Sequence, residues 1–213
     1  MESRAIKIYA PMNKRISMKI LPGHFATSNS HINQYIDLTT MKTRMNEAAE
    51  AARILAKQYV NGTIVDTIVC LDGCEVVGAF LAQELSGAGF RSMNMHQTIY
   101  IITPEFNTNG QMIFRNNNQP SVYNKNILLL AASATTGDTL RKSLDCIQYY
   151  GGIIQGISAI FSAVDKIDSI SVHSIYTAKD IPDYRSYSIG ECPMCKSKQR
   201  LEAIVNGHGY MKL

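Results

Sequence analysis

A cluster of small hydroxylated residues and a glycine follows an apolar run near the middle of the chain. The run from Ile127 to Leu130 is typical of a short buried strand, and from Thr139 onward apolar residues recur at helical spacing. A strand, a tight loop and a helix N-terminus direct free backbone N–H groups and the positive end of the helix dipole at one point. The loop therefore predicts a phosphate site, although any strand-to-helix turn can contain Thr and Gly. Its candidate ligands are Ala134, Thr135, Thr136, Gly137, Asp138 and Thr139.

A second strand-to-helix loop is predicted earlier in the chain. Residues 64–71 are rich in β-branched side chains and bounded by turn residues, which is typical of a buried parallel strand. The turn Asp72-Gly73-Cys74-Glu75 follows, and a helix is predicted from Val76 to Leu85. The alternatives for this turn are an anion-binding loop and an ordinary turn around a buried Cys74.

Cys192 and Cys195 form a Cys-x-x-Cys pair near the end of the sequence. Thiolates are preferred zinc ligands, but a structural zinc site takes four ligands and this pair supplies two. Zn²⁺ binding would therefore require His208, another cysteine or a second subunit, and a plain turn is the alternative. The sequence contains an odd number of cysteines, five, and the others are scattered, so we expect reduced thiols rather than a disulfide framework.

Composition limits the functional classes. The sequence of 213 residues, 46% of them hydrophobic, suffices for one domain with an appended segment. A net charge of +4 suits a protein that binds anionic small molecules, and the scattered Lys and Arg residues disfavour nucleic-acid binding. No signal-peptide core and no apolar run of about 20 residues is evident, which disfavours a membrane protein and predicts a cytoplasmic location.

Several elements are needed to position these loops. Alternating apolar residues from Ile6 to Ile20 predict a β-hairpin, whereas the segment from Gly23 to Asp37 has no clear period and by itself indicates a polar loop. A helix with a buried apolar stripe is predicted from Thr39 to Gly62. Strands that alternate with helices around Gly-rich turns predict an α/β fold with a largely parallel sheet flanked by helices.

The loop from Ala134 to Thr139 resembles the phosphoribosyl pyrophosphate signature of the type I phosphoribosyltransferases, which wraps a ribose 5′-phosphate. Residues 23–37 contain Gly-His-Phe, a Ser-rich turn, a His and a Tyr, and they resemble the N-terminal segment of orotate phosphoribosyltransferases. One branch of those enzymes also ends in a Cys-Pro-x-Cys motif like that at residues 192–195. The resemblance implies a type I phosphoribosyltransferase-like fold with a small N-terminal hood over the base.

The resemblance also implies roles for particular residues. In the hood, base contacts are implied for Phe25, Ser28, His31 and Tyr35, while Phe25 and His24 are equally well explained as structural core residues. In the second loop, backbone amides that bind pyrophosphate are implied at Gly73, Cys74, Glu75, Val76 and Val77.

Three positions depart from the family pattern. The two acidic residues that hold the ribose hydroxyls directly before the phosphate loop are replaced by Ala131 and Ala132. The segment where the family has a cationic catalytic loop contains Arg115 and Lys125 as its only cations, and Phe161 is followed by Ser162 where orotate enzymes have an Arg. Because such charges stabilise bound ribose and developing pyrophosphate, we expect weak catalysis with orotate.

The predicted organisation is a hood segment at residues 1–38, an α/β core at 39–180 and a tail with the Cys-x-x-Cys pair at 181–213. One hypothesis is a Mg²⁺-assisted transferase of pyrimidine biosynthesis that moves phosphoribose to a pyrimidine-like base, with Ser133 or Asp138 contacting the ribose. The other is a non-catalytic nucleotide-sensing or regulatory protein. In both, the ligand is phosphoribosyl pyrophosphate or a nucleotide 5′-phosphate, and the family implies a homodimer.

Overall fold

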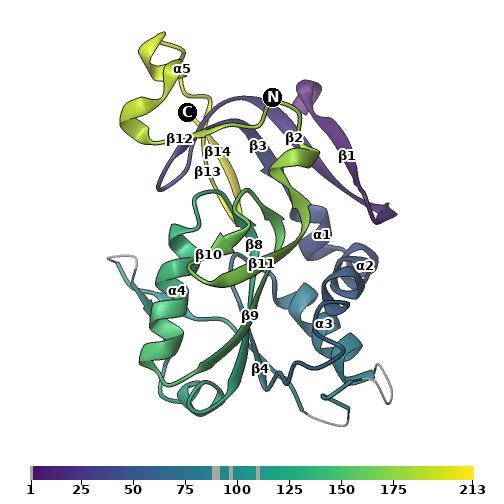
Figure 1. Ribbon diagram of the computed structural model, residues 1–213. Coiled ribbons are helices and arrows are strands. Elements are labelled where there is room, and N and C mark those ends of the chain that lie inside the picture. Colours follow the sequence, from purple (N-terminus) through teal and green to yellow (C-terminus); the bar gives the residue numbers. More distant parts are fainter. Residues whose placement is uncertain (1, 88–91, 96–97, 109–110) are drawn as a thin grey trace.

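The computed structural model describes residues 2–87, 92–95, 98–108 and 111–213. Within these ranges the core is a six-stranded sheet with strand order β10-β11-β9-β8-β4-β5, and every pair except β10 with β11 is parallel (Figure 1). The central strands are almost wholly buried because both faces of the sheet are covered. The strands are β4 (Thr67–Cys70), β5 (Tyr100–Ile102), β8 (Asn126–Ala134), β9 (Ile153–Ser162), β10 (Lys166–Ile167) and β11 (Ile170–Thr177).

Helices lie on both faces of this sheet. Helices α2 (Met45–Ala56) and α3 (Glu75–Gly87) pack on one face and α4 (Asp138–Tyr149) on the other (Figure 1). Side chains of β8 alternate between two apolar clusters, so that Leu130 belongs to the α2–α3 side and Leu129 to the α4 side. The predicted α/β fold with a largely parallel sheet flanked by helices is confirmed.

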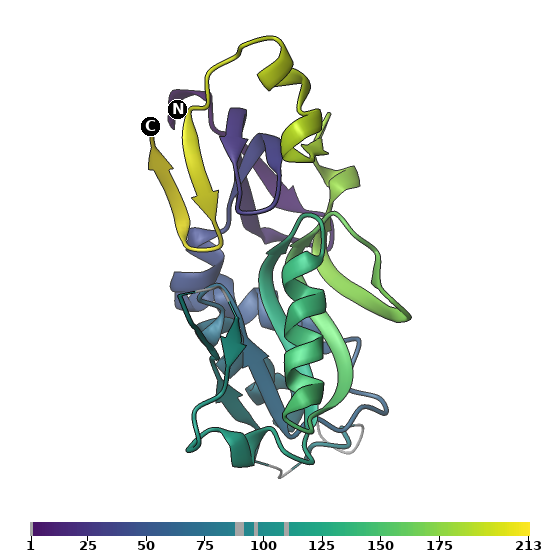
Figure 2. The same cartoon turned by 90° about the vertical axis from the view of Figure 1, so that its left-hand side faces the viewer.

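A second sheet forms the hood, with strand order β12-β3-β2-β13-β14 and β1 paired to β2. Residues from both ends of the sequence build it, because β13 runs parallel to the end of β2 with Ala203 opposite Phe25 (Figure 2). The tail after residue 181 is therefore part of the hood. Its strands are β1 (Ile6–Ala10), β2 (Asn13–Ala26), β3 (His31–Asp37), β12 (Ser186–Tyr187), β13 (Ala203–Asn206) and β14 (Gly209–Lys212).

The segment from Gly23 to Asp37 was interpreted from its pattern as a polar loop, and this is wrong. Strand β2 continues to Ala26 and β3 begins at His31, so a four-residue turn at 27–30 is the only irregular part of this segment. Several of its polar side chains contact the tail, since Asn33 donates to the Asp183 carbonyl and Gln34 to the Pro182 carbonyl, and His24 is fully buried. Tertiary contacts of this kind override a weak local period.

The predicted helix from Thr39 to Gly62 is divided in two. Helix α1 (Thr39–Thr43) ends at Arg44, whose extended backbone (φ −94°, ψ 119°) separates it from α2. Met45 begins α2 and is 65% exposed, although the apolar stripe of an unbroken helix would include it in the core. The remaining short elements are β6 (Glu105–Phe106), β7 (Met112–Ile113), α5 (Pro193–Lys196) and 3₁₀ turns at Glu2–Arg4, Gln119–Ser121, Ala178–Asp180 and Ile189–Glu191.

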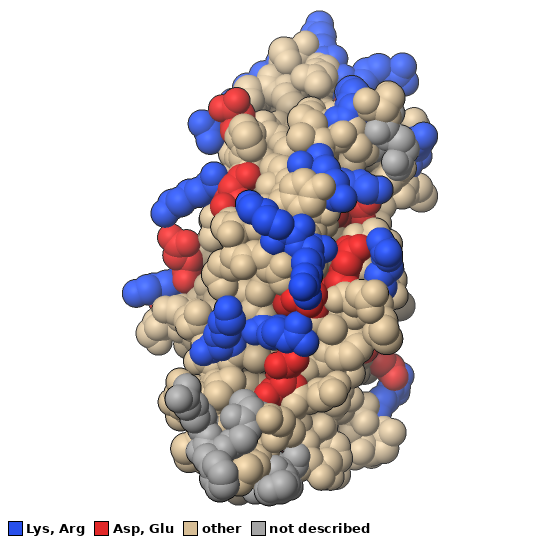
Figure 3. All heavy atoms as spheres, turned by 90° about the vertical axis from the view of Figure 1, so that its right-hand side faces the viewer, with Lys and Arg blue, Asp and Glu red and all other residues tan. Residues whose placement is uncertain are grey.

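The surface carries charges of both signs side by side. Figure 3 shows Lys and Arg interspersed with Asp and Glu over one face of the molecule. On α2, Arg53 forms ion pairs with Glu50 at 2.9 Å and with Glu84 of α3 at 3.3 Å. Among the described residues, no helix combines the length and apolar character needed to cross a membrane.

Candidate functional site

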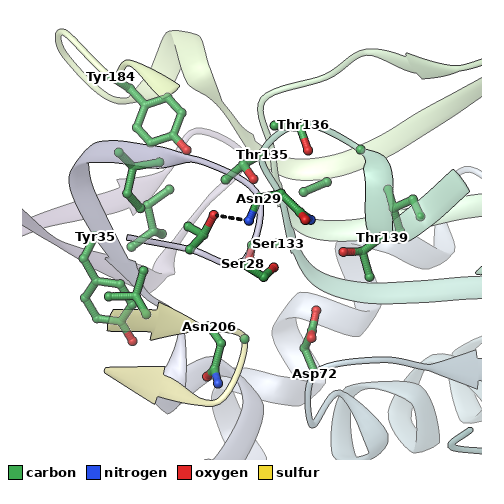
Figure 4. A pocket seen from close by; sticks show the side chains of 18 residues that line it. Ser28, Asn29, Tyr35, Asp72, Ser133, Thr135, Thr136, Thr139, Tyr184 and Asn206 are labelled. Carbon is green, nitrogen blue, oxygen red and sulfur yellow. Dashed lines mark hydrogen bonds between the residues drawn. The ribbon is translucent and has the colours of Figure 1, made fainter. Parts of the chain in front are cut away.

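A pocket of about 160 Å³ lies between the loop after β8 and the hood (Figure 4). This position is the carboxyl end of a central parallel strand, where α/β proteins bind ligands. Of the predicted phosphate ligands, all but Asp138 line the pocket. The lining residues are Thr27, Ser28, Asn29, Ile32, Tyr35, Ile36, Asp72, Ser133, Ala134, Thr135, Thr136, Gly137, Thr139, Leu140, Tyr184, Val205, Asn206 and Gly207.

The phosphate loop has the backbone geometry of an anion site. Gly137 has φ +83° directly before the first residue of α4, and a side chain there would collide with Ile167. The loop thus aims the N-terminus of a twelve-residue helix at the pocket. The Thr136 hydroxyl donates to the Asp138 carboxylate at 2.9 Å, whereas the Thr135 hydroxyl makes no hydrogen bond with any described residue.

The hood contributes the turn between β2 and β3. The Thr27 N–H donates to the Ser30 carbonyl at 2.8 Å, and the Thr27 hydroxyl oxygen accepts the Ser30 N–H at 2.9 Å. These bonds hold Ser28 and Asn29 at the tip, where both line the pocket opposite the phosphate loop (Figure 4). Polar groups from two separate layers therefore converge on one small space.

The second loop, after β4, is positioned differently. Asp72 lines the pocket, but the predicted pyrophosphate ligands Gly73, Cys74, Glu75, Val76 and Val77 do not. Cys74 and Val77 are fully buried, and burial raises the pKa of the Cys74 thiol well above its usual range. Glu75 accepts a hydrogen bond from the Thr103 hydroxyl at 2.9 Å.

A buried lysine covers this second loop. The Lys42 ammonium donates to the Asp72 carbonyl at 2.8 Å and to the Gly207 carbonyl in the turn between β13 and β14. Burial raises the pKa of the Asp72 carboxyl, while Lys42 and His208 oppose this shift. The C-terminal hairpin and the second loop are thus joined through one cation.

Charged groups contribute little to the pocket. Asp72 is the one charged side chain among the described lining residues. Arg115, the candidate cation of the catalytic loop, forms an exposed ion pair with Glu105 at 2.7 Å. The described lining residues therefore offer a ligand hydroxyl and backbone donors rather than cations.

Several other predicted residues lie outside the pocket. Phe25 is fully buried in the hood core, whereas Ser28 and Tyr35 line the pocket. Ala131 and Ala132 lie within β8 and are each 1% exposed, so neither position opens onto the ligand space.

His31 belongs to a different cluster. It lies with His24 beside Cys192 and Cys195, and the four candidate ligand atoms all lie within 4.8 Å of one another. Burial lowers the pKa of His31, and His24 lowers it further. His208, which the sequence suggested as a further zinc ligand, is not part of this cluster. It lies beside the second loop, with its Nδ1 atom 3.7 Å from where a Cβ on Gly73 would be.

The sequence patterns missed several pocket residues. Asp72 had a usable signal, because it directly follows a buried strand and so lies at the carboxyl edge of the sheet. Tyr184, Asn206 and Gly207 had none, since they belong to the tail. Tyr184 lies beside β12, which pairs with β3, and the other two follow the pairing of β13 with β2.

No protein-family model matches the sequence, and no curated protein matches it. Solved structures do resemble the fold. The chain is 16% identical to orotate phosphoribosyltransferase from Aeropyrum pernix, covering 75% of this chain and 88% of that one, with a TM-score of 0.51. Adenine phosphoribosyltransferase from Thermoanaerobacter pseudethanolicus gives 15% identity, coverages of 83% and 96%, and a TM-score of 0.51.

UMP synthase from Leishmania donovani gives 15% identity and a TM-score of 0.55, with 75% of this chain matching 34% of that one. This chain thus spans about a third of the UMP synthase chain. The neighbours are type I phosphoribosyltransferases, so the predicted type I phosphoribosyltransferase-like fold is confirmed.

Proposed function

We propose that this protein binds the 5′-phosphate of a phosphoribosyl compound, either phosphoribosyl pyrophosphate or a nucleoside 5′-monophosphate, in the pocket after β8. The observation that carries the proposal is the convergence of the loop at Ser133–Thr139 with the hood turn at Ser28 and Asn29. Backbone N–H groups at a helix N-terminus bind phosphate without a partner cation. The free hydroxyl of Thr135 adds a donor that nothing in the described protein satisfies.

The pocket volume limits how much of the ligand it holds. About 160 Å³ is roughly half the smallest volume typical of a small-molecule site. The pocket suits the phosphate and part of the ribose, and Ser133 and Asn29 are placed to form hydrogen bonds with the ribose hydroxyls. The base or pyrophosphate then lies beyond it, and a larger cavity that shares Ser28, Asn29 and Thr139 is adjacent.

One residue of this site, Asp72, could act as a ligand for Mg²⁺. Asp72 is the carboxylate that faces the pocket, and Mg²⁺ in nucleotide sites is commonly held by one or two carboxylates together with the phosphates of the ligand. A bound Mg²⁺ would neutralise pyrophosphate charge. The buried positions of Ala131 and Ala132 offer no second carboxylate.

Binding is favoured over rapid turnover with orotate. Lys42 is engaged by two backbone carbonyls and Arg115 by Glu105, so neither is free to neutralise developing pyrophosphate charge. Phe161 is fully buried against Tyr184, with ring centroids 5.3 Å apart, at the strand end where an Arg would contact orotate. A nucleotide-sensing protein is therefore the primary assignment.

Transfer of phosphoribose to another pyrimidine-like base is the second candidate. The hood favours it, because the rings of Tyr35 and Tyr184 line the pocket across from Thr139 (Figure 4). Aromatic side chains of this kind supply apolar contact area to a planar ligand.

Calorimetry separates these candidates. Phosphoribosyl pyrophosphate, nucleoside monophosphates and ribose 5-phosphate are titrated into the protein, with and without Mg²⁺, beside a pyrophosphate-release assay over a panel of bases. We expect saturable binding of the phosphorylated ligands and little release with orotate. Binding of unphosphorylated nucleosides with equal affinity would refute the proposal, and orotate turnover at about 1 to 10³ s⁻¹ would refute its non-catalytic part.

We also propose a homodimer, in line with the family resemblance. Exposed aromatic side chains near the catalytic-loop segment, such as Phe106 and Tyr149, offer apolar area for a partner. Light scattering at micromolar concentration should give twice the chain mass, and a monomer mass would contradict this assembly.

A further inference from the structure

Two histidines and two cysteines from distant parts of the sequence meet at the end of the hood. His24 lies in β2 and His31 in β3, on either side of the turn at 27–30, while Cys192 and Cys195 bracket the start of α5. The His24 Nε2 and His31 Nδ1 atoms are 3.2 Å apart. From Cys195 Sγ the distances are 3.2 Å to His31 Nδ1 and 3.6 Å to His24 Nε2, and Cys192 Sγ lies 3.5 Å from His24 Nε2.

These separations match the edges of a tetrahedron around zinc. Zinc binds imidazole nitrogen at about 2.0–2.1 Å and thiolate sulfur at about 2.3 Å, which places two nitrogens about 3.3 Å apart and nitrogen and sulfur about 3.6 Å apart. The four measured distances, 3.2, 3.2, 3.5 and 3.6 Å, lie close to these values. Two hydrogen-bonded pairs alone would not bring all four ligand atoms within 4.8 Å of one another.

The surroundings orient the ligands. The other ring nitrogen of His24, Nδ1, lies 2.9 Å from the Gln199 carbonyl oxygen, which fixes the proton on Nδ1 and leaves Nε2 free to bind a metal. In the cysteine turn the Lys196 N–H donates to the Cys192 carbonyl at 3.1 Å and the Lys198 N–H donates to the Cys195 carbonyl at 2.9 Å. These bonds present both sulfurs toward the histidines.

We propose that His24, His31, Cys192 and Cys195 form a structural zinc site that fastens the C-terminal tail to the hood hairpin. Two thiolates and two neutral imidazoles around Zn²⁺ carry no net charge, so the complex is compatible with the burial of His24 and Cys192. Four protein ligands fill the tetrahedral shell, which distinguishes a structural site from a catalytic one. Cys195 is exposed and gives the ion a route of entry.

The site has a defined mechanical role. His24 and His31 hold the two strands that enter and leave the turn at 27–30, and the tip of that turn lines the pocket. Zinc therefore fixes the separation of the hairpin strands and anchors α5 against them. Because a metal bound only to the folded state stabilises it, removal of zinc should lower the unfolding temperature.

The test uses the full chain without an affinity tag, purified under reductant. We expect elemental analysis to find about one zinc per chain and Co²⁺ substitution to give the intense visible absorption of tetrahedral thiolate coordination. Cys195→Ser and His31→Ala should each lose most of the zinc. Cys146→Ser and His173→Gln, which change the same residue types outside the cluster, should retain it.

A second measurement requires no variant. Chelation of zinc from the wild-type protein should lower the unfolding temperature by more than about 5 °C, and adding back Zn²⁺ should restore it. The proposal is overturned if the reduced protein takes up neither Zn²⁺ nor Co²⁺, if Cys195→Ser holds as much zinc as the wild type, or if Cys192 and Cys195 form a disulfide under reductant. None of these readouts depends on phosphate binding, so they stand apart from the proposed function.

Discussion

The two strand-to-helix loops of the core both contain a glycine with positive φ but differ in what covers them. Strands β4 and β8 are parallel neighbours, and each is followed by a glycine with positive φ, Gly73 at +76° and Gly137 at +83°. The loop after β8 opens into the pocket. Among the described residues, the loop after β4 presents only Asp72 to the pocket, and Lys42 ties it to the turn containing Gly207.

Under the proposed function, a strand-to-helix turn makes an anion site only where a third element leaves its amides accessible. After β8 the hood turn stands across a cavity, so polar groups remain for a ligand. After β4 the turn of the C-terminal hairpin lies against the loop. The Lys42 ammonium donates its hydrogen bonds to the Asp72 and Gly207 carbonyls and not to a ligand. The contrast can be tested by altering each loop in turn.

The largest effect is expected for Gly137→Val. A Cβ at φ +83° is strained, and it would also collide with Ile167, so the loop must move away from its phosphate-binding geometry. We expect affinity for ribose 5-phosphate to fall by more than about 100-fold in calorimetry, the combined effect of several lost charge-assisted hydrogen bonds.

Gly151→Val is the matched control for this change. Gly151 also has positive φ, at +78°, and a Cβ there would meet Tyr123 at 2.8 Å, far from the pocket. That variant should lose stability and keep its phosphate affinity. Equal affinity in the two variants would remove the distinction between the loops.

A smaller loss is expected for Thr135→Val, which removes one hydroxyl donor and keeps the shape of the side chain. A hydrogen bond to a charged group contributes about 1.5–3 kcal/mol, so the affinity for ribose 5-phosphate should fall roughly 10- to 100-fold. The matched variant in the second loop region is Thr103→Val, whose hydroxyl donates to Glu75. If Thr103→Val weakened binding as much as Thr135→Val, both loops would contact the ligand.

The smallest effect is expected for Asp72→Asn, which tests the charge that the second loop presents to the pocket. Burial raises the pKa of Asp72, and its ionised form repels a bound phosphate. Affinity for inorganic phosphate at neutral pH should therefore rise by roughly 3- to 10-fold in the variant.

The pH dependence follows from the same shift. Because the folded state raises the pKa of Asp72, its contribution to stability is full below the ordinary carboxyl pKa and is lost as pH rises through the raised value. Thermal unfolding of Asp72→Asn should lack this decline. A wild-type curve that runs parallel to that of the variant from acid to neutral pH would contradict the assignment.

The buried strands and the loop at residues 134–139 could be predicted from the sequence. Residues 64–71 and 127–130 predicted buried strands because a strand buried on both faces is largely apolar, and the structure has β4 and β8 there. The phosphate loop was predicted because its six neighbouring residues contain both the turn geometry and the donors. Asp138 is the exception, since its carboxylate is bonded to Thr136 and does not line the pocket.

The sequence by itself thus determined the parallel sheet and the strand, loop and helix N-terminus after residue 126, whose information is local. Only the tertiary structure decided that residues 23–37 form strands, that Asp72 and Asn206 face the pocket, and that His24 and His31 meet the two C-terminal cysteines. His24 and Cys192 are 168 residues apart in the chain, and no local propensity encodes their contact. The pairings of β12 with β3 and of β13 with β2 bring them together, because a polar strand becomes stable only when another part of the chain covers it.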